Sequence, residues 1–249
     1  AYGNFLIQAP LGILSNSLIL PILTKFSKLK ADKKYVELGK NLTIGIEYCF
    51  LTTIFLTAFF ITFNNQIVQL AFQRGAFDLE AVNQVRKILI AYSIGIPFYL
   101  YRDLLVRTYY SIEKTKLPFK LSLLGILLNI FFDWILIRVL TPYNLEIEGI
   151  ILSSAAVNFI ICSILSINLK NFNLRLPFSL LFVKILLISL SAVITGYICL
   201  SIFQNVPQVN TFIEKVFVLI LELLTFFIIY FLITKFLKVN SFKIYQKKI

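Results

Sequence analysis

The sequence predicts an all-α membrane protein, a polytopic bundle of about seven transmembrane helices. Hydrophobic residues make up 59% of the chain, whereas a soluble domain has about 45–50% apolar residues. Runs of roughly 20 apolar residues recur along the whole length, and a helix of that length crosses a bilayer core about 30 Å thick. The connections between the runs are short and polar. These three observations exclude one soluble domain packed around a single core.

The apolar runs divide the chain into seven expected spans. They cover residues 5–23, 42–63, 88–110, 120–139, 149–167, 177–203 and 213–237. The first span contains Pro10 and ends near Pro21, and the third contains Pro97. Membrane helices tolerate such prolines because neighbouring helices re-satisfy the freed carbonyls. Between the second and third spans, residues 67–72 form a run too short to cross, which we expect at the membrane interface.

The distribution of basic residues predicts the orientation. Most of the 24 Lys and Arg residues lie in alternate connections and in the tail. They are Lys25, Lys28, Lys30, Lys33, Lys34 and Lys40 in the first connection, Lys114, Lys116 and Lys120 in the third, Lys170, Arg175 and Lys184 in the fifth, and Lys235, Lys238, Lys243, Lys247 and Lys248 in the tail. By the positive-inside rule, the C-terminus is cytoplasmic and the first residues face outward.

The net charge of +12 is therefore mostly a topology signal. The Lys residues sit in short juxtamembrane loops and form no continuous basic face, so we expect membrane lipids, and no nucleic acid, as partners. With no His in the sequence, His-based triads and His-containing zinc sites are excluded. Cys49, Cys162 and Cys199 lie inside apolar runs and are interpreted as packing residues. We find no nucleophile–base pair and expect no enzymatic activity.

Ionisable side chains inside the spans are costly, by about 2.5–3.5 kcal/mol each on insertion scales. They are Glu47, Arg102, Asp103, Arg107, Asp133 and Glu222. Asp103 and Arg107 have the i,i+4 spacing of an intrahelical ion pair. Arg102 points elsewhere on the same helix, where it either snorkels to the interface or provides a counter-charge for an anionic headgroup or diphosphate. The sequence gives Glu222 no partner.

Asn129 and Asp133 lie one turn apart on one face of the fourth span. Their oxygens suit a hard cation such as Na⁺. The alternative is a hydrogen-bonded pair that joins helices, a common role for polar residues in membranes. A proton is a third possibility, because burial raises the pKa of a carboxyl group.

Three segments carry a resemblance to a known family. They are AYGNFLIQAPLGILSNSLILPILTKFSKL at residues 1–29, LAFQRGAFD at residues 70–78 and YYSIEKTKLPFKLSLLGILLNIFFD at residues 109–133. The first resembles the segment of the MurJ/MviN lipid II flippases that ends in Leu-Pro and a Ser-Lys-bearing loop. The second is similar to that family's Phe-x-Arg-Gly-Ala-Phe loop, and the third to its Asn-x-x-x-Asp pattern. The resemblance covers essentially the whole chain and weakens after Lys170.

The resemblance implies a fold and a function. This family belongs to the multidrug/oligosaccharidyl-lipid/polysaccharide exporter superfamily, whose members have two lobes around a cationic cavity. It moves undecaprenyl-diphosphate-linked peptidoglycan precursor across the bacterial cytoplasmic membrane by alternating access. The seven spans match the second lobe of fourteen helices, so the missing N-terminal lobe of the same polypeptide is an expected partner. A multidrug or polysaccharide-lipid exporter, and a non-transporting scaffold or inert fragment, are the alternatives.

The resemblance also implies site residues. It matches Asn129, Asp133, the carbonyl of Ile150 and the hydroxyl of Ser154 to a sodium site, with a further Asp expected upstream of Ala1. Many relatives carry an acidic–basic pair at positions that match Asn4 and Phe5, and here neither residue is charged. The counter-charge for a diphosphate is therefore expected from Arg102 or from the missing lobe.

Overall fold

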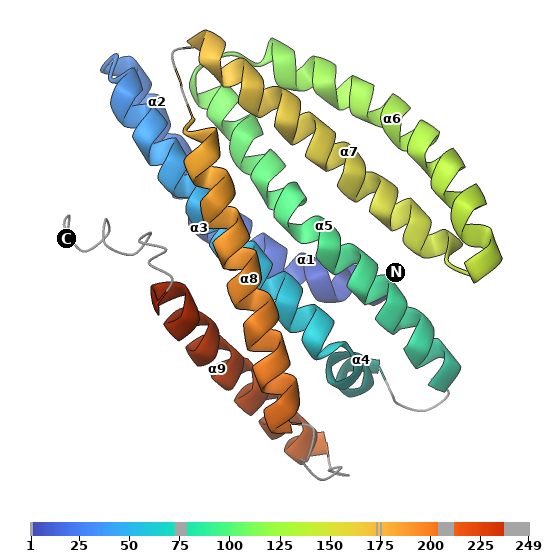
Figure 1. Cartoon of the computed structure of the whole chain (residues 1–249). Coiled ribbons are helices and arrows are strands. Elements are labelled where there is room, and N and C mark those ends of the chain that lie inside the picture. Colours follow the sequence, from blue (N-terminus) through green and yellow to red (C-terminus); the bar gives the residue numbers. More distant parts are fainter. Residues whose placement is uncertain (1, 73–78, 173, 175, 204–211, 237–249) are drawn as a thin grey trace.

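The computed structural model describes residues 2–72, 79–172, 174, 176–203 and 212–236, and every regular element in them is a helix (Figure 1). In chain order these are α1 (Tyr2–Leu14), the π-helix η1 (Ser15–Ile19), α2 (Leu20–Ala31), α3 (Tyr35–Thr62), α4 (Asn64–Phe72), α5 (Leu79–Ser111), α6 (Lys116–Leu140), the 3₁₀-helix η2 (Thr141–Tyr143), α7 (Glu146–Asn168), the 3₁₀-helix η3 (Leu169–Phe172), α8 (Phe178–Phe203) and α9 (Phe212–Phe236). The predicted all-α fold class is confirmed.

Seven helical segments of the described chain are long and apolar enough to cross a membrane. Several extend beyond the apolar runs that predicted them. α3 begins at Tyr35, before the expected start at residue 42, and α5 begins at Leu79 rather than at residue 88. A helix continues for as long as its backbone hydrogen bonds do, and hydropathy does not mark where they end. As a result, Glu47 lies near the middle of α3.

The first span bends between α1 and α2. The π-helix η1 lies at the junction, and Pro21 follows in the first turn of α2, where its missing N–H breaks no helical bond. Figure 1 shows α2 leaving α1 at a steep angle. Single-turn π segments inside α-helices occur frequently at functional sites. Here the segment places Ser15 against α5, as described below.

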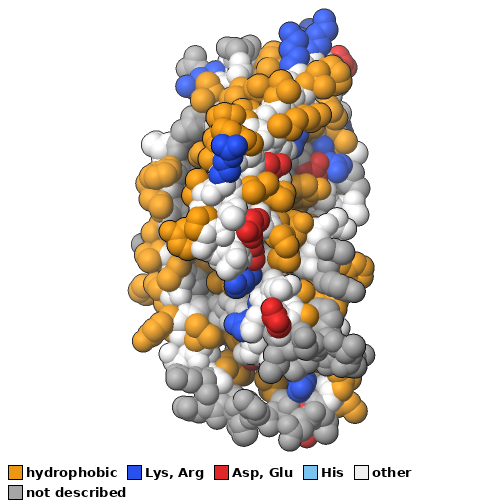
Figure 2. All heavy atoms as spheres, turned by 90° about the vertical axis from the view of Figure 1, so that its right-hand side faces the viewer, with side chains coloured by type: hydrophobic (Ala, Val, Ile, Leu, Met, Phe, Trp, Pro, Cys, Tyr) orange, Lys and Arg blue, Asp and Glu red, His pale blue; other side chains and the backbone are white. Residues whose placement is uncertain are grey.

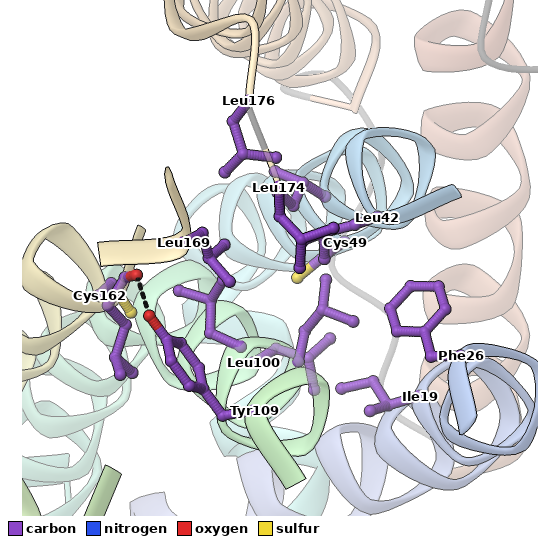
Figure 3. Close-up of a cluster of buried hydrophobic side chains, with 14 of the residues drawn as sticks. Ile19, Phe26, Leu42, Cys49, Leu100, Tyr109, Cys162, Leu169, Leu174 and Leu176 are labelled. Atoms are coloured by element: carbon purple, nitrogen blue, oxygen red, sulfur yellow. Dashed lines mark hydrogen bonds between the residues drawn. The ribbon is translucent and has the colours of Figure 1, made fainter. Parts of the chain in front are cut away.

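α5 is the central helix, because α1, α3 and α7 all pack against it. α6 covers the outer side of α7, α8 packs on α3, and α9 packs on α8 (Figure 1). The main apolar core lies between α2, α3, α5 and α7, and it includes Phe26, Leu42, Leu100 and Tyr109 (Figure 3). Tyr109 Oη donates a hydrogen bond to the Leu165 carbonyl at 2.8 Å. Cys49, Cys162 and Cys199 are buried free thiols, as expected for packing residues.

Large hydrophobic side chains also cover the outer surface. On α6 they include Leu123, Ile126, Leu127, Ile130 and Trp134, each more than half exposed. Figure 2 shows hydrophobic side chains spread over one face, with basic side chains at its upper end and further charged side chains along its middle. A soluble monomer rarely exposes continuous apolar patches of this size. The outer surface of the bundle is suited to lipid.

The connections at the basic end are joined to one another. Lys30 at the end of α2 forms an ion pair with Glu113, between α5 and α6, at 2.7 Å. The ammonium group of Lys114 lies over the Phe172 ring, 5.7 Å from its centroid. The hydrogen bond and positive charge of Lys30 lower the pKa of the Glu113 carboxyl below its ordinary value. The α2–α3, α5–α6 and α7–α8 connections therefore meet at the same end of the bundle.

Candidate functional site

α6 and α7 form an antiparallel pair in close contact, joined by the short η2 segment. Two glycines allow the close approach. A Cβ atom on Gly149 would lie 3.2 Å from the Leu136 carbonyl oxygen, and one on Gly125 would lie 2.8 Å from Ile161 Cδ1. These contacts fix the register of the pair, so that residues 125–136 of α6 face residues 149–161 of α7. Asn129 and Asp133 lie inside this closely packed stretch.

Asp133 has a hydroxyl partner on the opposite helix. Ser153 Oγ, on α7, contacts Asp133 Oδ1 and also lies 2.7 Å from the Ile150 carbonyl oxygen. A hydroxyl has one proton and can donate to only one of these acceptors at a time. When it donates to the Ile150 carbonyl, its lone pairs face the Asp133 carboxylate, an arrangement that a cation between them would stabilise. The two helices thus bring together three oxygen atoms.

Asn129 provides a further oxygen. It lies one turn before Asp133 on the same face of α6, and its Oδ1 atom is buried without a hydrogen-bond partner among the described residues. Orphaned buried acceptors of this kind are rare in native structures and call for an explanation, such as an ion. In the register set by the glycines, Asn129 faces α7 near Val157. Its carbonyl oxygen can therefore join those of Asp133, Ser153 and Ile150 around one cation.

The structure separates the two serines of α7. Ser153, rather than Ser154, is the residue whose hydroxyl reaches Asp133, while Ser154 is exposed on a neighbouring face. Successive residues of a helix point about 100° apart. The hydroxyl predicted at Ser154 and the hydroxyl that contacts Asp133 therefore lie on different faces of α7. Of the four residues matched to a sodium site, Asn129, Asp133 and the Ile150 carbonyl lie at the α6–α7 interface.

The chemistry of this set fits a hard monovalent cation. Every available ligand is an oxygen atom, and only one of them belongs to a carboxylate, which suits Na⁺ better than a thiophilic or strongly charged metal. No group of three or more His, Cys, Asp or Glu side chains that would hold a metal ion occurs in the described part of the chain. Asn129, Asp133, Ser153 and Ile150 would together hold the ion.

Ser154 instead lines a cavity of about 480 Å³ between α1, α5 and α7. Its walls combine apolar residues with neutral polar groups. The polar lining residues are Asn4, Gln8, Ser15, Asn16, Tyr92, Tyr99, Ser154 and Asn158. None of the described residues that line the cavity is an Asp, Glu, Lys or Arg. Hydrogen-bond donors and acceptors are thus available there without a fixed charge.

Arg102 lies behind this wall. Its Nη1 donates to Asn158 Oδ1 at 2.9 Å, and its Nη2 lies 3.4 Å from Ser122 Oγ. The guanidinium therefore links α5 to both α6 and α7, and Asn158 is the residue through which it reaches the cavity. Asn158 could be noticed in the sequence as a polar residue inside an expected span. Nothing in the sequence indicated that Ser122, near the start of α6, would contact Arg102.

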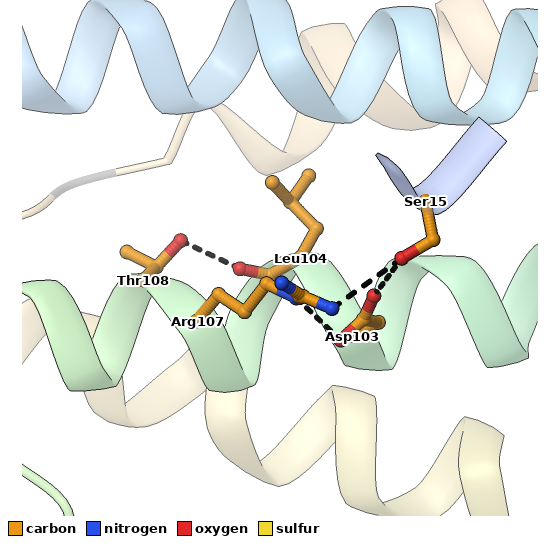
Figure 4. Close-up of polar contacts among 5 residues, drawn as sticks. All are labelled: Ser15, Asp103, Leu104, Arg107 and Thr108. Atoms are coloured by element: carbon orange, nitrogen blue, oxygen red, sulfur yellow. Dashed lines mark hydrogen bonds and ion pairs between the residues drawn. The ribbon is translucent and has the colours of Figure 1, made fainter. Parts of the chain in front are cut away.

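The predicted pair of Asp103 and Arg107 is present, with Arg107 Nε 2.8 Å from Asp103 Oδ1 (Figure 4). Ser15 of η1 completes it. Its Oγ donates to Asp103 Oδ2 at 2.6 Å, and Arg107 Nη2 lies 3.4 Å from the same Oγ. This contact holds the π-helix against α5. The sequence offered no signal for it, because Ser15 is far from Asp103 along the chain.

A second depression lies on the opposite side of α1. It is an apolar groove of about 530 Å³ between α1, α3 and α9. Pro10, Ile13 and Leu14 form its α1 wall, and Phe55 and Phe227 are among the residues that face them. α1 therefore separates a polar cavity from an apolar groove.

Comparison with known proteins agrees with this architecture. Residues 1–221 match the family model described as lipid II flippase MurJ. A probable lipid II flippase MurJ of Synechocystis sp. is 34% identical over 227 residues, which is 90% of this chain and 41% of that protein. A lipid II flippase MurJ of Thermosipho africanus is 27% identical over 175 residues, 69% of this chain and 35% of that protein. The chain spans less than half the length of these relatives.

A solved structure has the same fold. It is described as lipid II flippase MurJ in an inward closed conformation, and it superimposes with a TM-score of 0.75 at 23% sequence identity. The match covers 96% of this chain and 46% of that one. The family model covers most of the sequence and the helices superimpose over nearly all of it, so the chain belongs to the lipid II flippase MurJ family.

Proposed function

We propose that this chain forms one lobe of a lipid II flippase, which moves undecaprenyl-diphosphate-linked peptidoglycan precursor across the cytoplasmic membrane by cation-coupled alternating access. Its membership of the family supports this function. The N-terminal part of the same, longer polypeptide would supply a second lobe that faces α1 and completes the transport path. No covalent bond of the lipid is made or broken in such a step.

One observation carries the proposal: a polar cavity and an apolar groove flank the same helix, α1. A lipid-linked precursor has a sugar–diphosphate head that needs hydrogen bonds and a long hydrocarbon chain that does not. The amides and hydroxyls of Asn4, Gln8 and Asn158 suit the head. The groove beside Pro10 and Phe55 suits the chain. A substrate that is polar throughout would use only the polar cavity, and one that is apolar throughout would use only the apolar groove.

The diphosphate also needs positive charge. Arg102 reaches the cavity wall through its hydrogen bond to Asn158, and we propose that it contributes to the field felt by the headgroup. Asn4 and Phe5 are uncharged, so the remaining counter-charge would come from the second lobe.

The α6–α7 interface would hold Na⁺ as the coupling ion. A ligand shifts a conformational equilibrium only if it binds one state more tightly than another. Here the ligands come from two helices, so separating α6 from α7 removes ligands from the ion. Asp133 provides the negative charge, and Asn129, Ser153 and Ile150 provide neutral oxygens. A proton on Asp133 is the alternative coupling ion.

The basic end of the bundle would face the cytoplasm, with the C-terminus on the same side. Lys25, Lys30, Lys114 and Lys170 lie in or beside the connections that meet there. Anionic headgroups of the inner leaflet attract such residues.

The decisive experiment uses the complete polypeptide that contains this lobe, produced in bacteria whose own lipid II flippase is conditionally depleted. We expect growth and the arrival of lipid II at the outer leaflet to be restored. A polypeptide that reaches the membrane in normal amount but leaves lipid II inside would contradict the proposal. Efflux of drugs without any effect on lipid II would instead identify an exporter of the same superfamily.

A further inference from the structure

Two glutamates are buried in the interior of this bundle, and they have opposite surroundings. Glu47 of α3 is 5% exposed, and Glu222 of α9 is 2% exposed. Lys184 Nζ of α8 lies 2.5 Å from Glu47 Oε1, so that carboxylate has a cationic partner. Glu222 forms no salt bridge with any residue the structure describes. The two buried carboxyl groups therefore differ: Glu47 is paired with a cation, and Glu222 is not paired with any described cation.

The polar contacts of Glu222 are weak and incomplete. Gln66 Nε2, on α4, lies 3.4 Å from Glu222 Oε1, near the limit for a hydrogen bond. The other oxygen, Oε2, is buried and lacks a partner among the described residues. An ionised carboxylate accepts hydrogen bonds at both oxygens and has about four sites for them. One long contact leaves nearly all of that capacity unused.

In the part of the chain that the structure describes, the residues found near Glu222 on the packed elements are uncharged. Phe63, which caps the C-terminal end of α3, has its ring 6.1 Å from that of Phe226, one turn along α9 from Glu222. α4 contributes the amide of Gln66. On α8, which packs against α9, the thiol of Cys199 is a buried titratable group close enough to interact electrostatically with Glu222. These groups provide neither the positive charge nor the water that an ionised carboxylate requires.

From this contrast we propose that Glu222 is a proton-binding site, occupied at neutral pH, and that its proton holds α4 against α9. An isolated ionised carboxylate in an apolar site is so costly that the group takes up a proton instead. The neutral acid removes the charge, and its carbonyl oxygen still accepts the hydrogen bond from Gln66. No step of the proposed lipid transport or sodium binding uses Glu222.

Loss of the proton would place a negative charge between α4 and α9. That charge needs water, and α4 is the element that can admit it, because α4 has only nine residues and ends at the edge of the bundle (Figure 1). α4 lies at the end opposite the Lys-rich connections. Proton occupancy of Glu222 thus controls whether α4 packs on α9.

Infrared spectroscopy of the protein in lipid nanodiscs tests the protonation. The difference spectrum between wild type and Glu222→Gln at neutral pH is expected to show the C=O stretch of a protonated carboxylic acid, lost in the variant. Glu47→Gln is the matched control, and its difference spectrum is expected to show only the loss of an ionised carboxylate band. A Glu222 difference spectrum that shows a lost carboxylate band, like that of Glu47, would overturn the proposal.

Hydrogen exchange tests the link to α4. Between mildly acidic and alkaline pH, the amides of residues 64–72 in wild type are expected to lose protection beyond the change seen in Glu222→Gln, which cannot ionise. The amides of α3 serve as the internal reference. Equal pH dependence of α4 in wild type and Glu222→Gln would show that the proton does not hold this helix.

Discussion

The hydroxyl of Ser153 on α7 contacts the carboxylate of Asp133 on α6, so the two helices are joined at the centre of the candidate cation site. The neighbouring Asn129 has a buried side-chain carbonyl oxygen that finds no partner among the residues the structure describes. A cation at this point would satisfy the orphaned oxygen and neutralise the carboxylate. Its binding would depend on both helices remaining together.

Sodium is therefore expected to stabilise the protein through Asp133 and Ser153. A ligand at about 100 times its Kd adds about 2.7 kcal/mol to the free energy of unfolding. We expect replacement of choline by sodium to raise the Tm of wild type, with a smaller shift in Ser153→Ala and none in Asp133→Asn. Ser154→Ala is the matched control and should keep the full shift. An unchanged sodium shift in Asp133→Asn would refute the assignment.

Arg102 is expected to be needed for transport. Arg102→Glu reverses the charge behind Asn158 and should abolish growth of the depleted bacteria, although the polypeptide is present in the membrane. Arg102→Lys keeps the charge but cannot bridge Asn158 and Ser122 with two nitrogens of a planar group, and we expect partial growth. If Arg102→Glu supports normal cell-wall synthesis, the guanidinium is not needed for transport and only links α5 to α6 and α7.

The ion pair between Lys184 and Glu47 is expected to anchor α8 to α3. Removing one partner of a buried pair costs about 3–5 kcal/mol, because the other charge remains in the interior. Lys184→Met should therefore lower the Tm strongly, and the double variant with Glu47→Leu should recover most of the loss. The pair of Lys30 and Glu113 at the basic end is the control, since Glu113 is largely exposed and Lys30→Met should lower the Tm far less than Lys184→Met. A double variant no more stable than Lys184→Met would count against this account.

Gly149 is expected to be required for the close approach of α6 and α7. A methyl group there would meet the backbone of Leu136, which cannot rotate away, and overpacking of this kind costs about 1–3 kcal/mol. Gly149→Ala should lower both the Tm and the sodium shift. Gly12→Ala is the matched control, because a Cβ atom on Gly12 has nothing within 4 Å. Equal Tm values for the two variants would mean that α6 and α7 can separate at no cost.

Lys30 is expected to control the titration of Glu113 at the basic end of the bundle. The folded protein lowers the pKa of Glu113, so the stabilisation is present at neutral pH and disappears as the pH falls through that lowered pKa. Lys30→Met should move the pKa of Glu113 back up, as followed by the chemical shift of its carboxyl carbon. A pKa that stays low in the variant would point to another cause.

Much of the fold could be read from the sequence. Hydropathy is a property of single segments, and it predicted the seven spans without any knowledge of packing. The spacing of Asp103 and Arg107, and of Asn129 and Asp133, is likewise local, because one helix fixes both positions. The family resemblance was also local, because it came from short contiguous motifs.

The tertiary structure decided which residues from different helices meet. Ser153 rather than Ser154 contacts Asp133, Lys184 pairs with Glu47, and Gln66 lies against Glu222. Each of these contacts depends on the rotation and register of two helices, and a displacement of one residue turns a side chain by about 100°. The sequence determined that these polar groups lie in the membrane. Only the packing determined which of their atoms gained a partner and which, like Asn129 Oδ1 and Glu222 Oε2, have none among the described residues.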